Sequence, residues 1–347
     1  MARTKDAGEE RDDRAAEGKD GEDKAPKAIA GGMCLLHVRA TGESEASMTA
    51  ELAQPRAPTI PPRPLTSEVD VFGITDVGKA RKTNADHFLI ASFHRSLRVH
   101  ATSIGRDLGP HETESRGFIL LVADGVGALN AAAESSARAL DTVSQHLLHA
   151  SEICSTMAVS NQQETIDELK RAVTHAHQSL LADAERAGVP VSATTLTMYA
   201  AFWPRAFVVN VGDSRVYRLR GTDFRRLTTD QTVAQMMVEA GALTPEAAEA
   251  SKLKHVLWSA VGSDEVAPQV VVTDCDVRDR TLLCSDGLTK HVTDDEIREH
   301  LLRDMSSQET CRALLDLALA RGGSDNVTVV MGRVRKAATG TSPTRYP

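Results

Sequence analysis

Four aspartates lie beside a glycine, serine or asparagine at the edge of an apolar run that is typical of a β-strand. They are Asp124 in GFILLVADGVG, Asp213 in RAFVVNVGDSR, Asp286 in RTLLCSDGL and Asp325 in SDNVTVVMG. Strand ends are rigid, and a neighbouring glycine lets the backbone approach an ion closely. If the four carboxylates converge, they form a site for a hard cation such as Mg²⁺ or Mn²⁺. This pattern predicts a metal-dependent hydrolase.

A turn is the simpler interpretation of any one of these aspartates, because Asp-Gly is a favoured turn dipeptide. Turns are satisfied equally well by Asn, Ser or Gly-Gly. Turn chemistry alone therefore does not explain the choice of an acid at all four places. The set as a whole favours a shared site.

A glycine-containing turn upstream, TDVGKARKTNAD at 75–86, carries Arg81 five residues before Asp86. The planar guanidinium group can pair with two phosphate oxygens at once. Beside a metal centre, Arg81 would suit a phosphorylated substrate. Taken alone, it has the simpler interpretation of a solvated surface arginine.

Composition excludes several classes of protein. The net charge of −8 argues against a nucleic-acid binder. The five cysteines are odd in number and contain no C-x-x-C pair, so neither a disulfide framework nor structural zinc is expected. No apolar run reaches the roughly 18 residues of a membrane span, and the mixed-charge start is unlike a secretory signal. A cytoplasmic protein without a membrane or nucleic-acid partner is the expectation.

The chain divides into three parts by composition. Residues 1–66 are charged and then proline-rich, which predicts a disordered tail. Residues 67–335 carry the strand and helix patterns of a folded domain, and 336–347 form a second, short tail. The apolar patch at 31–38 is either a sticky spot in an unstructured tail or a docking motif. Two methionines within the first part leave open a biological start further downstream.

Strand and helix signals predict a layered α+β domain with two antiparallel sheets between helices. Four short runs between 194 and 228 indicate an antiparallel meander, and 269–274 with 280–284 indicate a hairpin. A polar loop is expected at 94–116, and a mobile segment near the site at 229–268. The remaining expected strands are 69–75, 87–93, 117–123 and 326–334, and the expected helices are 131–150, 164–186, 294–302 and 307–320.

Seven segments in order resemble the motif series of the PPM family, the metal-dependent (type 2C) protein serine/threonine phosphatases, in their bacterial form. They span about 67–335 and are TDVGKARKTNAD, VADGVGA, SATTLT, VGDSRVYRL, LTTDQT, LLCSDGL and GGSDNVTVV. The resemblance implies a four-layer α-β-β-α sandwich, with two antiparallel sheets flanked by helix pairs. It also implies a centre for two Mn²⁺ or Mg²⁺ ions at one edge.

The resemblance assigns the metal ligands. Asp124 would bridge the two ions, and the backbone carbonyl of Gly125 would be a further ligand. Asp286 and Asp325 would complete one ion's shell. Asp213 would join Asp286 around a third, weaker ion.

The resemblance also assigns residues around the ions. Arg81 would bind the substrate phosphate, and Asp86 would hold metal-bound water. Thr194 and Thr195 match strand residues beneath the site, and Asn326 would orient the aspartate before it.

Some positions depart from the family pattern. Many relatives have glutamate in place of Ala85 and glycine in place of Ala128, and a glycine-rich stretch where Ser192 and Ala193 stand. Eukaryotic members have a histidine, a candidate general acid, in place of Val126. No departure removes a carboxylate expected to bind metal, so activity is expected with altered metal affinity.

The expected enzyme is a Mn²⁺- or Mg²⁺-dependent protein phosphatase that hydrolyses phosphoserine and phosphothreonine by direct attack of a metal-bridging hydroxide. Its expected partners are phosphorylated proteins, including serine/threonine kinases and their substrates, and it is expected to be monomeric. Three alternatives remain open. They are a phosphatase of an anti-sigma-factor antagonist, a non-catalytic signalling module of the same fold, and an adaptor that acts through its N-terminal tail.

Overall fold

The computed structural model describes six stretches of the chain. They are residues 63–93, 96–97, 111–112, 117–127, 129–150 and 161–335. Apart from 63–66, the tails expected at 1–66 and 336–347 lie outside the described residues. So does most of the loop expected at 94–116.

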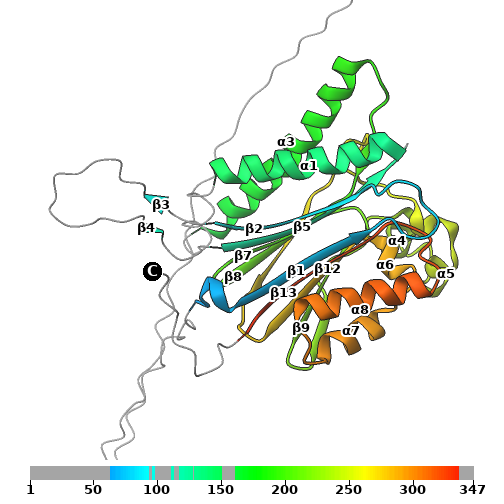
Figure 1. The fold of residues 1–347 in the computed structure, drawn as a ribbon. Coiled ribbons are helices and arrows are strands. Elements are labelled where there is room, and N and C mark those ends of the chain that lie inside the picture. The colour runs from blue at the N-terminus through cyan, green and yellow to red at the C-terminus, as the bar shows by residue number, and fades with distance from the viewer. Residues whose placement is uncertain are drawn as a thin grey trace, which may run out of the picture. The chain divides into compact units, whose positions relative to one another are not determined.

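The strands form two antiparallel sheets that lie face to face (Figure 1). The first sheet has the order β1 (Val69–Asp76), β13 (Val327–Val334), β12 (Asp279–Cys284), β9 (Arg215–Arg220) and β10 (Asp223–Arg226). The second has the order β11 (Gln269–Asp274), β8 (Arg205–Val211), β7 (Leu196–Phe202), β5 (Gly117–Val126) and β2 (Asp86–Phe93), and β6 (Ala193–Thr194) pairs with β5. A separate short pair joins β3 (Ser96–Leu97) and β4 (His111–Glu112).

Helices cover the outer face of each sheet (Figure 1). The second sheet is covered by α1 (Leu129–His149) and α3 (Gln162–Ala187), and the first by α7 (Asp294–Leu302) and α8 (Ser307–Ala320). The expectation of a four-layer α+β sandwich is confirmed. Short helical segments complete the described part: η1 (Thr66–Glu68), α4 (Val233–Glu239), α5 (Pro245–Ala250), η2 (Lys252–His255) and α6 (Asp286–Thr289). Among the described residues, no helix is long and apolar enough to span a bilayer.

Alternation of side chains along β5 explains why the layers pack in this order. Ile119 and Leu121 contribute to the core beneath α1 and α3, whereas Leu120 and Val122 contribute to the core between the two sheets. Successive residues of a strand point to opposite faces. A strand that is apolar on both faces is therefore buried on both, as GFILLVA predicts.

The helices α7 and α8 start at the expected residues because each begins with a capping box. Thr293 and Glu296 cap each other's backbone at the start of α7, and Ser306 and Glu309 do so at the start of α8. Such pairs satisfy two otherwise unpaired backbone N–H groups, which fixes the first residue of the helix.

Two expectations about strand pairing were wrong. The expected hairpin of 269–274 and 280–284 does not form, because β11 pairs with β8 while β12 pairs with β9 and β13. The expected meander is divided as well, since β7 and β8 lie in one sheet and β9 and β10 in the other. The chain crosses between the sheets at Gly212, whose φ of 103° favours glycine.

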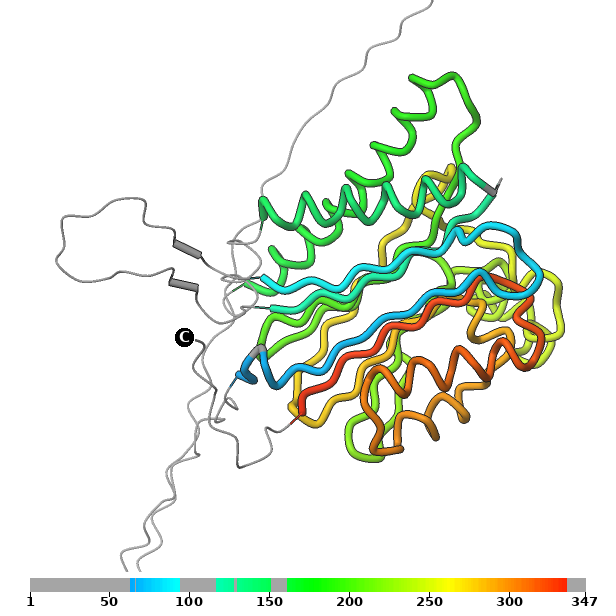
Figure 2. The backbone as a smooth tube through the Cα atoms, viewed as in Figure 1, coloured from blue at the N-terminus to red at the C-terminus, as the bar shows by residue number. Residues whose placement is uncertain are grey.

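The turn between β1 and β2 lies against the start of β13, at the end of the sheets where α4, α5 and α6 gather (Figures 1 and 2). The N–H of Lys79 donates to the carbonyl of Gly323 (2.7 Å). Gly78 has φ +74°, and a Cβ there would lie 2.1 Å from the carbonyl oxygen of Asp325. Glycine at this turn therefore brings the arginine-bearing segment against the last predicted metal ligand.

Candidate active site

A cavity of about 550 Å³ opens at this end of the two sheets. Five of the six charged residues that the sequence predicted for the site line it, Asp86 being the exception: Arg81, Asp124, Asp213, Asp286 and Asp325. Gly125 and Asn326 are also in its wall. Segments far apart in the sequence thus contribute to a single cavity.

The backbone of Asp124 is held by hydrogen bonds with the hydroxyl groups of two neighbouring threonines. The hydroxyl of Thr194 donates to the carbonyl of Asp124 (3.0 Å), and the N–H of Asp124 donates to the hydroxyl of Thr195 (3.0 Å). The next residue, Gly125, pairs with Thr194 where β5 extends to meet β6. A Cβ on Gly125 would lie 2.2 Å from the carbonyl oxygen of Ala132. This close approach explains the glycine after the acid.

Asp86 lies behind the cavity wall, 2% exposed. Its Oδ2 accepts hydrogen bonds from the hydroxyls of Ser285 (2.6 Å) and Thr328 (2.8 Å). Its Oδ1 is buried and has no hydrogen-bond partner among the described residues. Burial, with the charge of Asp286 adding to it, raises the pKa of Asp86 to about 6 even though these two hydroxyls lower it.

Asp286 and Asp325 are joined by positive side chains. Nζ of Lys290 lies 2.6 Å from Oδ2 of Asp286 and 2.7 Å from Oδ2 of Asp325. Nε of Arg81 lies 2.7 Å from Oδ1 of Asp325, and its Nη2 donates to Oδ2 (3.0 Å). Burial raises the pKa of Asp325, but the hydrogen bonds from Arg81 and Lys290 outweigh burial and hold it below its usual value.

The side chain of Asn326 contacts the turn that carries Arg81. Its Oδ1 accepts from the N–H of Ala85 (2.9 Å), and its Nδ2 donates to the carbonyls of Val77 (2.9 Å) and Thr83 (3.1 Å). The carboxylate of Asp325 is met by the backbone N–H of Asn326 (3.0 Å). Asn326 therefore connects β13 with the arginine-bearing turn.

The donors of this cavity fit divalent cations. Burial together with the charges of neighbouring aspartates raises the pKa of both Asp124 and Asp213 well above the usual value. The Oδ1 atoms of Asp86 and Asp286 are buried, and no residue that the structure describes forms a hydrogen bond with them. Within the described ranges, no three His, Cys, Asp or Glu side chains are already drawn together to hold an ion. Arg81 and Lys290 offset only part of the negative charge of these acids, and hard oxygen donors of this kind suit Mg²⁺ or Mn²⁺.

Sequence reasoning missed three residues that contact these acids. Lys290 follows Asp286 by four residues, a spacing that places two side chains on one face of a helix. That spacing was the available signal. Ser285 and Thr328 hold Asp86, but nothing in their sequence context marks them.

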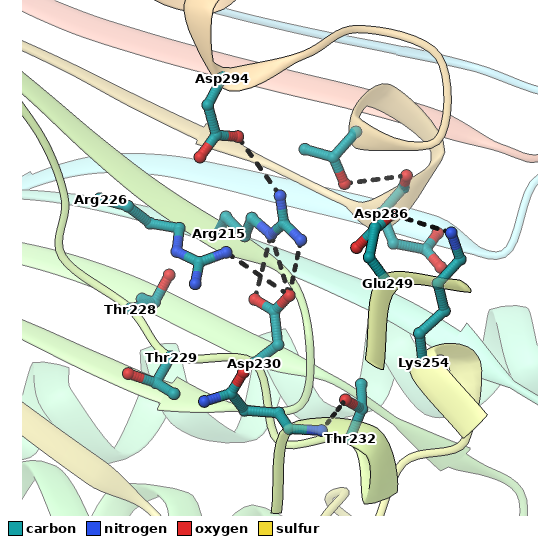
Figure 3. Close-up of polar contacts among 12 residues, drawn as sticks. Arg215, Arg226, Thr228, Thr229, Asp230, Thr232, Glu249, Lys254, Asp286 and Asp294 are labelled. Atoms are coloured by element: carbon teal, nitrogen blue, oxygen red, sulfur yellow. Dashed lines mark hydrogen bonds and ion pairs between the residues drawn. The ribbon is translucent and has the colours of Figure 1, made fainter. Parts of the chain in front are cut away.

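A second polar network anchors the segment beside the cavity (Figure 3). Arg215, from the GDSR segment, lies with Nη2 2.6 Å from Oδ2 of Asp230 and Nη1 3.4 Å from Oδ1 of Asp294. Arg226 approaches Asp230 from the other side (3.7 Å). The N–H of Gln235 donates to the hydroxyl of Thr232 at the start of α4 (3.2 Å). These contacts fix the TDQT segment to the first sheet.

Comparisons with known proteins agree with this geometry. The family model described as protein phosphatase 2C matches residues 102–320. Serine/threonine protein phosphatase PstP of Mycobacterium tuberculosis is 39% identical over 141 residues, 41% of this chain and 27% of that relative. Protein phosphatase PhpP of Streptococcus pneumoniae is 27% identical over 272 residues, 76% of this chain and 96% of the relative. The catalytic domain of PstP, solved in complex with 2 manganese ions, is 29% identical with a TM-score of 0.58, over 77% of this chain and 99% of that one.

The chain spans about a quarter of PstP and nearly the whole of PhpP. The family match begins after Arg81 and Asp86 and ends before Asp325, so the structure adds these residues to the matched core. The match covers more than half of the chain, and the resemblance seen in the sequence is confirmed: the chain belongs to the protein phosphatase 2C family.

Proposed function

We propose that this protein is a metal-dependent phosphatase that hydrolyses phosphoserine and phosphothreonine in proteins. The observation that carries the proposal is the convergence of four aspartates and Arg81 on one cavity. Family membership supports it, as do the names of the serine/threonine phosphatases PstP and PhpP. The manganese ions described for the PstP catalytic domain support the expected Mn²⁺ or Mg²⁺ dependence.

In this proposal the acidic wall of the cavity holds two ions. Asp124 would be shared by both ions, and the carbonyl of Gly125 would be a further ligand. Asp286 and Asp325 would hold one of the two ions, and Asp213 with Asp286 would hold a weaker third. When bound, the ions supply an activated water and offset charge on the phosphoryl group. The threonines beneath Asp124 keep its backbone in place, which preserves the geometry of the ligands.

Arg81 and Asp86 handle the substrate and the water. Arg81 has its side chain 49% exposed at the cavity, and its fork can bind two oxygens of a phosphate group. Asp86 is held through Oδ2, which leaves Oδ1 to accept a hydrogen bond from the attacking water. With a pKa of about 6, Asp86 is ionised above neutral pH and can act as that acceptor.

The proposed enzyme occupies residues 67–335, with accessory tails at 1–66 and 336–347. Its substrates are phosphorylated proteins, among them serine/threonine kinases and the proteins that they modify. We place it in the cytoplasm as a monomer. The cavity is suited to a phosphorylated side chain, because Arg81 can bind the phosphate group beside the acidic wall.

The alternatives are less favoured. A non-catalytic module of this fold would be expected to lack a metal-binding aspartate, whereas every predicted one lines the cavity. A phosphatase of an anti-sigma-factor antagonist would use the same chemistry, but PstP, PhpP and the Listeria relatives are named as serine/threonine or protein phosphatases. An adaptor acting through its tail would not need the site.

Hydrolysis of a phosphothreonine peptide by the full chain tests the proposal. Turnover should require Mn²⁺ or Mg²⁺ and stop with EDTA, and Asp286→Asn should abolish it while leaving the circular dichroism spectrum unchanged. Asp304→Asn is the matched control, because the side chain of Asp304 is 94% exposed and does not line the cavity. Turnover in EDTA, or full activity of Asp286→Asn, would contradict the mechanism.

A further inference from the structure

Lys290 connects two of the carboxylates that are proposed to bind metal. It follows the four-residue helix α6, and its ammonium group lies 2.6 Å from Asp286 and 2.7 Å from Asp325. Its side chain is 22% exposed and lines the cavity together with both acids. The sequence motif that identifies Asp286 says nothing of this lysine.

An ordinary helical ion pair is the simpler explanation of Lys290, since lysine four residues after an acid commonly pairs with it on a helix surface. One observation shows that this explanation is incomplete. The same ammonium group also reaches Asp325, which is 35 residues further along the chain. A contact that joins two elements inside a cavity differs from a solvated surface pair.

The remaining oxygens of the two carboxylates show what Lys290 supplies. Arg81 contacts both oxygens of Asp325. Asp286 has one oxygen on Lys290, and its other oxygen, Oδ1, is buried and finds no partner in the described part of the chain. Lys290 thus supplies the positive charge that pairs with Asp286. Burial lowers the pKa of Lys290, but the two carboxylates raise this pKa by more than burial lowers it. The pKa therefore lies above its usual value.

We propose that Lys290 is a built-in cation that holds Asp286 and Asp325 together when no divalent ion is bound, and that it releases at least one of them when an ion binds. The inference rests on the proposed role of these aspartates as ligands. Oδ1 of Asp286 has no partner among the described residues, but both oxygens of Asp325 are held by Arg81 or Lys290. An ion that coordinates both acids therefore competes with the ammonium group at Oδ2 of Asp325 and brings a second positive charge beside it. Because the two cations compete for the same carboxylates, linkage requires that Lys290 lower the affinity for the ion.

Lys290→Met tests this competition, because methionine has a similar length and no charge. We expect Mn²⁺ to bind about tenfold more tightly to the variant, within the range of roughly 5- to 150-fold that coupled sites usually show. Isothermal titration calorimetry of the full chain gives the dissociation constant, and electron paramagnetic resonance counts the bound Mn²⁺. Neither measurement depends on turnover.

Melting temperatures provide an independent readout, because the effect of the variant should differ between the metal-free and the metal-bound protein. In EDTA, Lys290→Met should melt below the wild type, because the two aspartates then repel each other without a counter-ion. In saturating Mn²⁺ this difference should disappear. A purely structural lysine would instead lower the melting temperature in both conditions. Lys290→Gln, which keeps a polar tip, serves as the second variant if the methionine variant does not fold.

Lys254→Met is the matched control. Lys254 lines a neighbouring cavity of about 310 Å³, and its ammonium group pairs with Glu249 at 2.9 Å (Figure 3). Its removal should leave the Mn²⁺ dissociation constant at the wild-type value. An unchanged or weaker affinity in both Lys290 variants, with the wild type binding Mn²⁺, would overturn the inference alone. A wild type that binds no Mn²⁺ would overturn the proposed function as well.

Discussion

Asp86 and Asp124 face each other directly across the pair of strands β2 and β5. Two carboxylates at opposed positions of an antiparallel pair repel each other, and the charge of Asp86 is among the causes that raise the pKa of Asp124. Ser285 and Thr328 compensate one of the two acids through hydrogen bonds. The carboxylates of Asp86 and Asp124 therefore repel each other beside the cavity, and a cation bound there would reduce this repulsion.

Asp86→Asn should make the metal-free protein more stable and less active. The amide keeps an oxygen that can accept from Ser285 and Thr328. It also removes a carboxylate whose burial raises its pKa to about 6. We expect the free energy of unfolding in EDTA at pH 8 to rise by about 1 to 3 kcal/mol. Urea unfolding measures this change, and a phosphopeptide assay measures the accompanying loss of activity. A destabilised variant would show that the charge of Asp86 is well solvated in the fold.

Gly287→Ala should disrupt the site because the backbone that leads into β13 passes too close. A Cβ on Gly287 would lie 1.8 Å from the carbonyl oxygen of Asn326, so the segment that carries Asp325 and Asn326 would have to move. We expect a loss of about 2 to 4 kcal/mol in the free energy of unfolding. Gly221→Ala is the control: its φ of +62° costs about 1 to 2 kcal/mol, but nothing lies within 4 Å. Equal losses in urea unfolding would refute the steric explanation.

The layers of the fold were predictable because periodicity reports which faces of an element are buried. The run GFILLVA is apolar on both faces and forms a strand between two cores. Capping residues such as Thr293 and Ser306 are local signals and fix helix starts. Sheet membership was not predictable. A short joint between two apolar runs looks the same whether the chain turns back in one sheet, as at 203–204, or crosses to the other at Gly212.

The acids of the site were predictable as a group because each follows or precedes an apolar run with a small residue beside it. Their partners were not. Ser285 and Thr328 meet Asp86, and Lys290 meets Asp325, through tertiary contacts that no spacing in the sequence encodes. Only the pair of Lys290 with Asp286 had a local signal, the spacing of four residues. Asn326 illustrates the same limit, since its side chain contacts the Arg81 turn.

Arg81→Lys should impair turnover although it preserves the charge. Lysine presents a single ammonium group, which cannot bind two oxygens of one group in the planar manner of arginine. We expect kcat/KM for a phosphothreonine peptide to fall by about ten- to a hundredfold, a loss in the range reported for charge-assisted contacts. Arg138→Lys is the matched control, because Arg138 has the same exposure (48%) and pairs with Asp183 at 3.0 Å on the helical layer. If both variants keep wild-type kinetics, Arg81 is a surface residue without a substrate role.

Acid should loosen the support beneath Asp124 through His177. Nδ1 of His177 accepts a hydrogen bond from the N–H of Gly262 (3.1 Å), and the preceding residue, Val261, exchanges two backbone hydrogen bonds with Thr194 (2.8 and 2.9 Å). Only an unprotonated Nδ1 can accept, and burial lowers the pKa of His177 below its usual 6.5. Because the folded-state pKa is depressed, this contribution to stability is complete above about pH 6.5 and is lost as the pH falls through the folded value.

Urea unfolding between pH 7.5 and pH 5 measures this contribution as the fall in the free energy of unfolding. His177→Asn keeps an acceptor that does not titrate, so its fall over this range should be smaller than that of the wild type. His149→Asn, at the exposed end of α1, should keep the wild-type slope. A His177→Asn variant with the wild-type slope would mean that the Gly262 contact survives protonation. A flatter slope, together with retained activity at pH 5.5, would connect the acid sensitivity of the enzyme with the segment that supports Asp124.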